Sequence, residues 1–339
     1  SKYNISWSNK KVNYKIYVKG YATMKVDLIT GFLGAGKTTF IHRYIAYLRR
    51  HGQKVRIIEN EFGAISVDSQ ILQEDNCEIQ DLTGMCMCCV GKEAFKHMLV
   101  DAAMDGCSRV IVEPSGIYDA DEFFDVMESE QVKSRCEIGA IIAIVDAKWE
   151  MGISGEADYL MLSQLLAAGK VLMSKAQLFS EEEKAHTIEE MNRLMETFGC
   201  ERRFGRDVIQ TDWDQLTDRD FLRLSMSGWN RIDHKKEYLN HGQIFTTCEI
   251  GGYCENIDDL QKRIQSMFRE ERYGTVFRVK GYVRDLEKNW YEVNCSPDIC
   301  NLEPCQGKRG LLVVIGQGLK EKELRKAFLS KEEMKQRTE

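Results

Sequence analysis

The sequence predicts an α/β protein in which a mainly parallel sheet is covered by helices and is followed by a smaller α+β domain. Apolar strand-like runs alternate with amphipathic helical patterns from Met24 onward, which is typical of a parallel sheet. A glycine-rich segment, Gly31–Thr38, joins the first strand-like run to the first helical pattern. The chain has 339 residues, and single cores usually stop growing near ~250–300 residues, so two domains are expected.

The elements of the first domain follow from the period of their apolar residues. Runs that are apolar almost throughout predict buried strands at Val26–Ile29, Val55–Ile58, Val110–Val112, Ile138–Val145 and Val171–Met173. Helical periods predict helices at Thr39–Arg50, Lys92–Ala103, Ala157–Ala168 and Ser180–Phe198. Because ligands bind at the carboxyl ends of parallel strands, the site is expected at that edge of the sheet.

The second domain is expected after a charged stretch between about 200 and 242. Strands are predicted at Gln243–Ile250, Thr275–Val283, Trp290–Val293 and Leu311–Ile315, and helices at Ile257–Arg269 and from Leu319. The predicted organisation is an N-terminal extension (1–23), a nucleotide-binding domain (24–210), a linker (211–242), the second domain (243–330) and a tail (331–339). Residues 1–23 carry five lysines and no acidic residue, and are either an upstream extension or a functional basic arm.

Composition excludes several classes of protein. Hydrophobic residues make up 43% of the chain and charged residues 29%, as in ordinary globular proteins. The net charge of −6 offers no basic surface for nucleic acid, and no run approaches the roughly 20 apolar residues of a membrane span. A cytoplasmic location is therefore expected, in which the 12 cysteines are reduced and serve metal or redox chemistry rather than disulfides.

The segment Gly31–Thr38 reads GFLGAGKT and predicts a phosphate-binding loop. Its glycines let successive backbone N–H groups point at one phosphate, and the following helix directs its positive end to the same anion. The predicted phosphate contacts come from Gly34, Ala35, Gly36, Lys37, Thr38 and Thr39. Lys37 is expected to neutralise the β- and γ-phosphates and the Thr38 hydroxyl to bind Mg²⁺, so the chain is expected to bind a nucleoside triphosphate.

A second oxygen ligand for Mg²⁺ is expected from Glu113. This residue ends the apolar strand Val110–Val112, where enzymes with a phosphate loop place the carboxylate that holds Mg²⁺ or orients the attacking water. Lys37 and Glu113 are thus the candidate catalytic residues. The alternative for Glu113 is a solvated acid at the end of a strand.

Three cysteines within four residues form a candidate site for a transition metal. Cys86, Cys88 and Cys89 place three soft ligands on one segment, and Glu59 is a candidate fourth ligand for Zn²⁺. A redox-active thiol cluster and cysteines without a function are the alternatives. A further set, Cys295, Cys300 and Cys305, lies in a predicted loop at spacings that match no standard zinc ribbon, and is either an accessory metal site or a group of ordinary loop cysteines.

Together these motifs resemble the CobW-like metallochaperone GTPases, a branch of the phosphate-loop GTPases. The resemblance rests on GFLGAGKT, ENEFG at Glu59–Gly63, the cysteine cluster, EPSG at Glu113–Gly116 and Val145–Ala147, in that order. In the second domain, RVKGY at Arg278–Tyr282 resembles the Arg-x-Lys-Gly strand of the CobW C-terminal domain. The resemblance implies a P-loop NTPase fold with slow GTP hydrolysis, coupled to binding Zn²⁺ or another transition metal for delivery to a client protein.

Two positions depart from the pattern of that family. The family reads guanine with Asn/Thr-Lys-x-Asp, whereas this chain has Ser174, Lys175 and, at the Asp position, Gln177. A glutamine carbonyl can accept a hydrogen bond but carries no charge, so ATP remains a candidate nucleotide beside GTP. The other departure is Ala64, where some relatives carry a further metal-binding Glu.

Two other functions are compatible with the same residues. One is a nucleotide-gated sensor of thiol oxidation, and the other is an activator or insertase that docks on a metal-dependent enzyme without carrying metal. The client protein, the physiological metal and the oligomeric state do not follow from the sequence.

Overall fold

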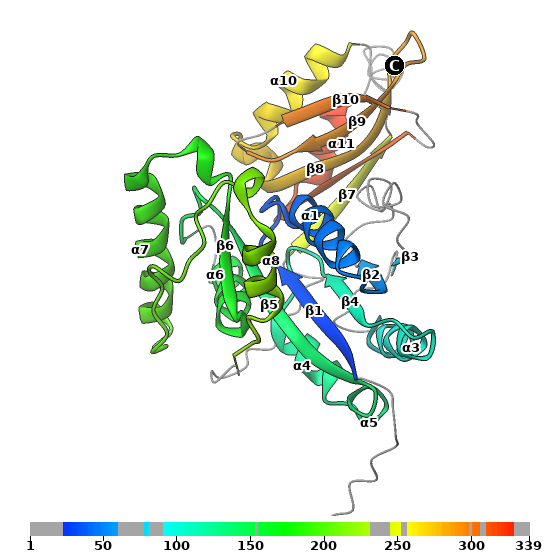
Figure 1. The fold of residues 1–339 in the computed structure, drawn as a ribbon. Coiled ribbons are helices and arrows are strands. Elements are labelled where there is room, and N and C mark those ends of the chain that lie inside the picture. The colour runs from blue at the N-terminus through cyan, green and yellow to red at the C-terminus, as the bar shows by residue number, and fades with distance from the viewer. Residues whose placement is uncertain are drawn as a thin grey trace, which may run out of the picture.

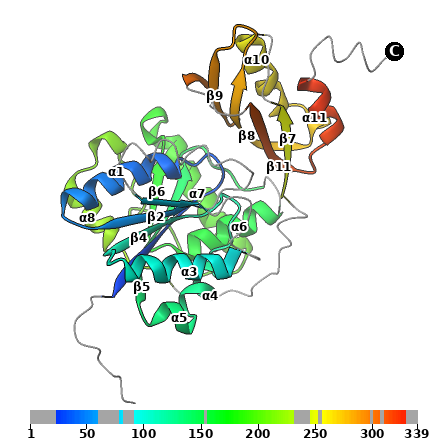
Figure 2. The ribbon, with the colours of Figure 1, turned by 90° about the vertical axis from the view of Figure 1, so that its right-hand side faces the viewer.

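The computed structural model describes residues 23–59, 78–81, 91–152, 155–230, 245–251, 256–297, 300–305 and 310–328. Two domains follow one another along the chain, the first drawn in blue to green and the second in yellow to red in Figure 1 and Figure 2. Among the described residues, no helix is both long and apolar enough to cross a membrane.

The first domain is built on a parallel sheet, which confirms the predicted fold class. The strand order is β3-β2-β4-β1-β5-β6, and every neighbouring pair is parallel. The strands are β1 (Met24–Thr30), β2 (Val55–Glu59), β3 (Glu78–Asp81), β4 (Arg109–Glu113), β5 (Cys136–Asp146) and β6 (Lys170–Ser174). Only the edge strand β3 was not predicted, because its short sequence EIQD has no apolar run.

Helices cover both faces of this sheet. On one face lie α1 (Lys37–Arg50) and α8 (Asp218–Ser225), which share a core with alternate residues of the strands. The other face carries α3 (Gly91–Met104), α4 (Ala120–Met127), α5 (Glu130–Lys133), α6 (Gly155–Ala167) and α7 (Glu181–Thr197) around a second core. Strand residues divide between the two cores because successive side chains point to opposite faces of a sheet.

Residues 211–230, predicted as part of the linker, pack against the first domain instead. The Trp213 ring meets Phe40 of α1 edge-on, with ring centroids 5.8 Å apart, and Phe221 of α8 stacks on Phe40 at 6.2 Å. The structure differs from this part of the linker prediction because the aromatics that pack on α1 are widely spaced in a charged sequence. The rest of the predicted linker, residues 231–242, lies outside the described residues.

A buried ion pair joins the two central strands of the sheet. Asp27 of β1 is fully buried and accepts hydrogen bonds from Arg109 of β4, from the Tyr44 hydroxyl at 2.7 Å and from the Ala140 N–H at 2.8 Å. The Arg109 guanidinium also donates to the Tyr44 hydroxyl at 3.2 Å. A Cβ atom at Gly139 would lie 2.2 Å from the Asp27 carboxylate, so this glycine provides the space for the pair.

The second domain is an antiparallel sheet with helices on one face. Its strand order is β10-β9-β8-β11-β7. The strands are β7 (Phe245–Gly251), β8 (Thr275–Arg284), β9 (Trp290–Cys295), β10 (Cys300–Cys305) and β11 (Leu311–Gln317), and the helices are α10 (Ile257–Met267) and α11 (Glu321–Phe328). The Asn256 side chain begins α10 by accepting hydrogen bonds from two backbone N–H groups of the first turn.

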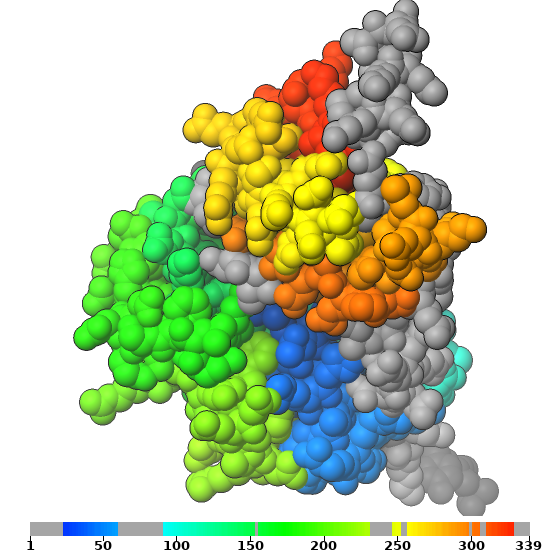
Figure 3. Space-filling view, turned by 90° about the horizontal axis from the view of Figure 1, so that it is seen from above, coloured from blue at the N-terminus to red at the C-terminus, as the bar shows by residue number. Residues whose placement is uncertain are grey.

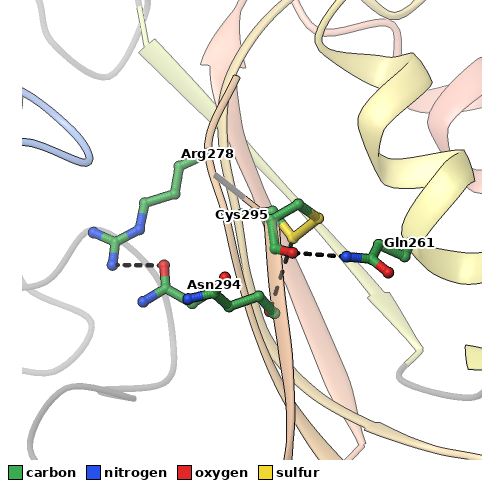
Figure 4. Close-up of a disulfide and its surroundings, with 6 residues drawn as sticks. Gln261, Arg278, Asn294 and Cys295 are labelled. Carbon is green, nitrogen blue, oxygen red and sulfur yellow. Dashed lines mark hydrogen bonds between the residues drawn. A yellow bond between two sulfur atoms is a disulfide. The ribbon is translucent and has the colours of Figure 1, made fainter. Parts of the chain in front are cut away.

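The predicted cysteine loop of this domain is a hairpin. β10 pairs with β9 so that Cys300 lies opposite Cys295, and the two form a disulfide (Figure 4). Cys305 lies at the other end of β10, opposite Trp290 and roughly 17 Å along a strand that rises ~3.3 Å per residue. The three cysteines therefore do not converge on a metal, and the expectation of fully reduced cysteines is wrong for this pair. Pro304 is tolerated because β10 is an edge strand.

Candidate nucleotide-binding site

The phosphate loop lies at the carboxyl end of β1, where the strand passes into α1. Gly34 and Gly36 have φ values of 77° and 92°, in the left-handed region that favours glycine. The N–H of Ala35 donates to the Phe32 carbonyl at 3.2 Å and closes the loop. The loop thus leads directly into a helix N-terminus, whose free N–H groups favour an anion.

Lys37 is held inside this loop. Its Nζ donates to the Gly31 carbonyl at 3.0 Å and lies 3.5 Å from the Phe32 carbonyl, and the side chain is buried. A buried ammonium group requires polar partners, which the loop backbone provides. The charge is therefore fixed at the loop before any phosphate arrives.

The two candidate magnesium ligands are in contact. The Thr38 hydroxyl donates to Glu113 Oε1 at 2.9 Å, which brings together the end of β4 and the first turn of α1. Glu113 is 7% exposed, so it is not a solvated acid at the end of a strand. Hydroxyl and carboxylate oxygens are ligands that Mg²⁺ prefers, and one or two protein ligands suffice for it beside phosphates. The residues present fit this ion.

Glu59 lies beside Glu113 at the same edge of the sheet. β2 and β4 are paired so that these two glutamates are directly opposite, and neighbouring strands lie roughly 4.8 Å apart. Glu59 is also buried. The candidate transition-metal ligand and the candidate magnesium ligand are therefore neighbours, and charge at one affects the other.

The EPSG segment packs directly on the phosphate loop. A Cβ atom at Gly116 would lie 2.6 Å from the Leu33 nitrogen and 2.8 Å from the Leu33 Cα, so no other residue fits without a backbone shift. This glycine therefore allows the EPSG backbone to lie against the phosphate loop. A movement of the segment that follows Glu113 would therefore displace the backbone of Leu33.

The candidate base-reading residues lie at the end of β6. Lys175 has a left-handed φ of 57°, and its Nζ lies 2.5 Å from Oδ2 of Asp146 at the end of β5. Ser174 is buried, and its hydroxyl donates to the Val145 carbonyl at 3.4 Å. Gln177 is exposed in the short helix that follows. These groups share the strand edge with the phosphate loop, where a nucleotide can contact both.

Trp213 belongs to this site but was assigned to a linker from the sequence. Its Nε1 donates to the Met173 carbonyl at 3.0 Å, just before Ser174. A Cβ atom at Gly36 would lie 3.3 Å from the indole and 3.8 Å from the Ser174 Cβ. The indole therefore lies beside both the phosphate loop and the base-reading segment.

Lys280 of β8 is a second residue that the sequence did not place at the site. The side chain is 1% exposed. Burial lowers the pKa of Lys280 to about 7, the Lys37 charge acts in the same direction, and the Glu59 carboxylate opposes them. A charged group of the second domain therefore lies within electrostatic reach of the phosphate loop.

The cysteine cluster lies outside the described residues, as do residues 60–64. Within the part of the chain that the structure describes, no group of three or more His, Cys, Asp or Glu side chains is arranged to hold a metal ion. Cys86, Cys88 and Cys89 stay predicted ligands.

Comparison with known proteins finds a family for each domain. The family model "CobW/HypB/UreG, nucleotide-binding domain" matches residues 25–199. The family model "Cobalamin synthesis protein cobW C-terminal domain" matches residues 256–331.

Three curated relatives illustrate the similarity. "Zinc chaperone YjiA" of Escherichia coli (strain K12) is 33% identical over 175 residues, which are 48% of this chain and 52% of the relative. "Zinc chaperone YeiR" of the same organism is 26% identical over 303 residues, 82% of this chain and 88% of the relative. "Zinc-regulated GTPase metalloprotein activator 1" of Dictyostelium discoideum is 28% identical over 218 residues, 53% of this chain and 45% of the relative. The chain spans about half the length of the first and third relatives.

Proposed function

Because the chain belongs to the CobW/HypB/UreG family, we propose that it is a GTPase that binds Zn²⁺ or another transition metal and delivers it to a client protein. The observation that carries the proposal is the contact of Thr38 with Glu113 beside Lys37, in a chain that has both CobW domains. YjiA and YeiR, zinc chaperones by name, support zinc as the metal. The Dictyostelium relative, by name a metalloprotein activator, supports a protein client.

Hydrolysis in this proposal depends on positioned charge. Lys37 neutralises the β- and γ-phosphates, and the N–H groups from Gly34 to Thr39 donate to phosphate oxygens. Thr38 and Glu113 hold Mg²⁺, which supplies further positive charge to the transferring phosphoryl group. With these groups alone the intrinsic turnover is slow, and a partner or the bound metal accelerates it.

The transition-metal site of the proposal combines Glu59 with the cysteine cluster. Asp81 of β3 lies opposite Glu59 of β2, and Cys86 follows Asp81 by five residues, a reach of at most roughly 17 Å. This length of chain is compatible with a site that joins the cluster to Glu59, which in turn lies beside Glu113. If GTP tightens metal binding, metal tightens GTP binding by the same factor. The proposal includes a cytoplasmic location, where these thiols are kept reduced.

Metal content tests the proposal. We expect anaerobically purified protein to bind about one zinc ion per chain, and Cys88→Ser to bind it more than ~100-fold more weakly, because a ligand is lost. Competition with a chromophoric chelator measures both affinities. Cys200→Ser is the matched control, because Cys200 is a half-buried free thiol three residues after α7.

Two results would contradict the metal assignment. Zinc retained by Cys88→Ser would argue against the cluster as the site. Wild-type protein without zinc affinity would favour a thiol sensor, or an activator that carries no metal.

Gln177→Asp is expected to raise the preference for GTP over ATP by about ten- to hundredfold. A carboxylate accepts charge-assisted hydrogen bonds from guanine, each of which is worth ~1.5–3 kcal/mol. Competition between the two nucleotides for a fluorescent GTP analogue measures the change. Gln131→Asp, on the exposed side of α5, should leave the preference as in the wild type. A wild-type protein that already strongly prefers GTP would show that the missing charge is replaced by another group.

A further inference from the structure

The two faces of the sheet of the second domain pack against different partners, one against the helices of that domain and the other against the phosphate loop. On β11, Val314 lies in the core under α10 and α11, whereas Val313 lies in a cluster that packs against Leu33 of the phosphate loop. On β8, the Phe277 ring meets Phe32 of the same loop edge-on, with centroids 5.5 Å apart. Figure 3 shows the orange surface of the second domain lying against the blue surface of the first. The phosphate loop is thus part of the domain interface.

Lys280 lies on the face that meets the phosphate loop. It is opposite Val313 of β11 and Asn294 of β9, and directly opposite residues share one face of a sheet. Figure 4 shows Asn294 accepting a hydrogen bond from Arg278, at 3.2 Å, on the side of the sheet away from Gln261 of α10. Because the Lys280 side chain is 1% exposed, it is enclosed where the domains meet.

Two charges of the first domain act on Lys280. They are the Lys37 ammonium group of the phosphate loop and the Glu59 carboxylate at the end of β2. The ammonium groups of Lys37 and Lys280 therefore act on one another from the two domains, at a buried position where charges are weakly screened. Additional negative charge on the loop would turn the repulsion between the two lysines into a shared attraction.

We propose that Lys280 is a second phosphate-binding cation of the nucleotide site, supplied by the C-terminal domain. It binds the terminal phosphate of a nucleoside triphosphate and so favours GTP over GDP. Docking of the second domain tightens triphosphate binding by some factor. By linkage, triphosphate binding favours docking by the same factor. This inference rests on the phosphate site proposed at Lys37.

Lys280→Met in the full chain tests this role. We expect the Kd of a non-hydrolysable GTP analogue to rise about tenfold or more, while the Kd of GDP changes by less than about threefold, because only the triphosphate carries the charge that is bound. Lys280→Arg, which keeps the charge, should retain most of the preference for triphosphate. Titration of fluorescent nucleotides at fixed salt measures these constants. Lys262→Met, at an exposed position of α10, is the matched control.

The domain interface gives a second readout. Small-angle X-ray scattering should show a smaller radius of gyration for the wild type with the GTP analogue than with GDP, and no such difference for Lys280→Met. An equal loss of affinity for both nucleotides, or no loss, would overturn the proposal, because a residue that only supports the fold affects both alike. A wild type whose radius is the same with both nucleotides would overturn the docking role.

Lys37→Met distinguishes failure of this inference from failure of the phosphate site. If that variant binds the analogue as the wild type does, the assignment of the phosphate site is wrong. If it loses both nucleotides while Lys280→Met binds normally, only the role of Lys280 is wrong. Because replacing a buried charge by an apolar side chain is often neutral for stability, Lys280→Met is expected to fold, and its thermal unfolding curve checks this.

Discussion

Arg109→Met should lower the free energy of unfolding by about 3–5 kcal/mol, one of the largest effects of any single substitution in the first domain. The guanidinium is the cationic partner of Asp27, which is fully buried on the face of the sheet that α1 covers. Without it, the carboxylate keeps only its hydrogen bonds from Tyr44 and Ala140 and must be ionised in an apolar site or become protonated. Urea denaturation of the nucleotide-free protein measures the loss.

Two further variants make this prediction specific. The double variant Asp27→Leu with Arg109→Met should recover most of the loss, since replacing both partners of a buried pair by apolar groups is often nearly neutral. Arg50→Met removes one partner of the exposed pair between Arg50 and Asp218, and should cost no more than the ~0–1 kcal/mol typical of surface pairs. A loss for Arg109→Met as small as that for Arg50→Met would show that the buried pair contributes little.

The parts of the fold that the sequence predicts are those with a local signal. β1, β2 and β4 are short apolar runs, and each can be recognised as a strand from its own residues alone. The phosphate loop is also local, because its turns need Gly34 and Gly36 at positive φ and the helix follows directly. Both could be predicted with the correct boundaries to within a few residues.

The parts that the sequence does not predict depend on contacts between distant segments. Trp213 and Phe221 lie in a charged stretch, and only their packing on α1 shows that it belongs to the first domain. β10 has a proline and alternates polar residues at a sheet edge, so nothing in its composition separates it from a loop. Lys280 would be assigned to solvent in an isolated strand, and it is buried only because the second domain docks on the phosphate loop.

Lys37→Met should leave the stability of the protein almost unchanged and weaken nucleotide binding, whereas the effect expected of Arg109→Met is a loss of stability. We expect the midpoint of thermal unfolding to stay within a few degrees of the wild type, because Met has a similar length and a buried charge is removed. The Gly31 carbonyl loses its donor, which costs ~1 kcal/mol, and Lys280 loses a repelling neighbour, which offsets part of that cost. Differential scanning fluorimetry without nucleotide measures this part.

Nucleotide affinity should fall about 100-fold or more in the same variant, since charge-assisted bonds to phosphate are worth ~1.5–3 kcal/mol each and Lys37 is the cation that the loop encloses. Titration with a fluorescent GTP analogue measures this second part, and Lys54→Met, at an exposed position before β2, should bind as the wild type does. A large loss of stability would mean that the Lys37 charge holds the loop together. Unchanged affinity would mean that the phosphates bind elsewhere. The expected result is a stable protein that binds nucleotide weakly. It follows only if the buried Lys37 charge serves to bind the ligand and does not stabilise the fold.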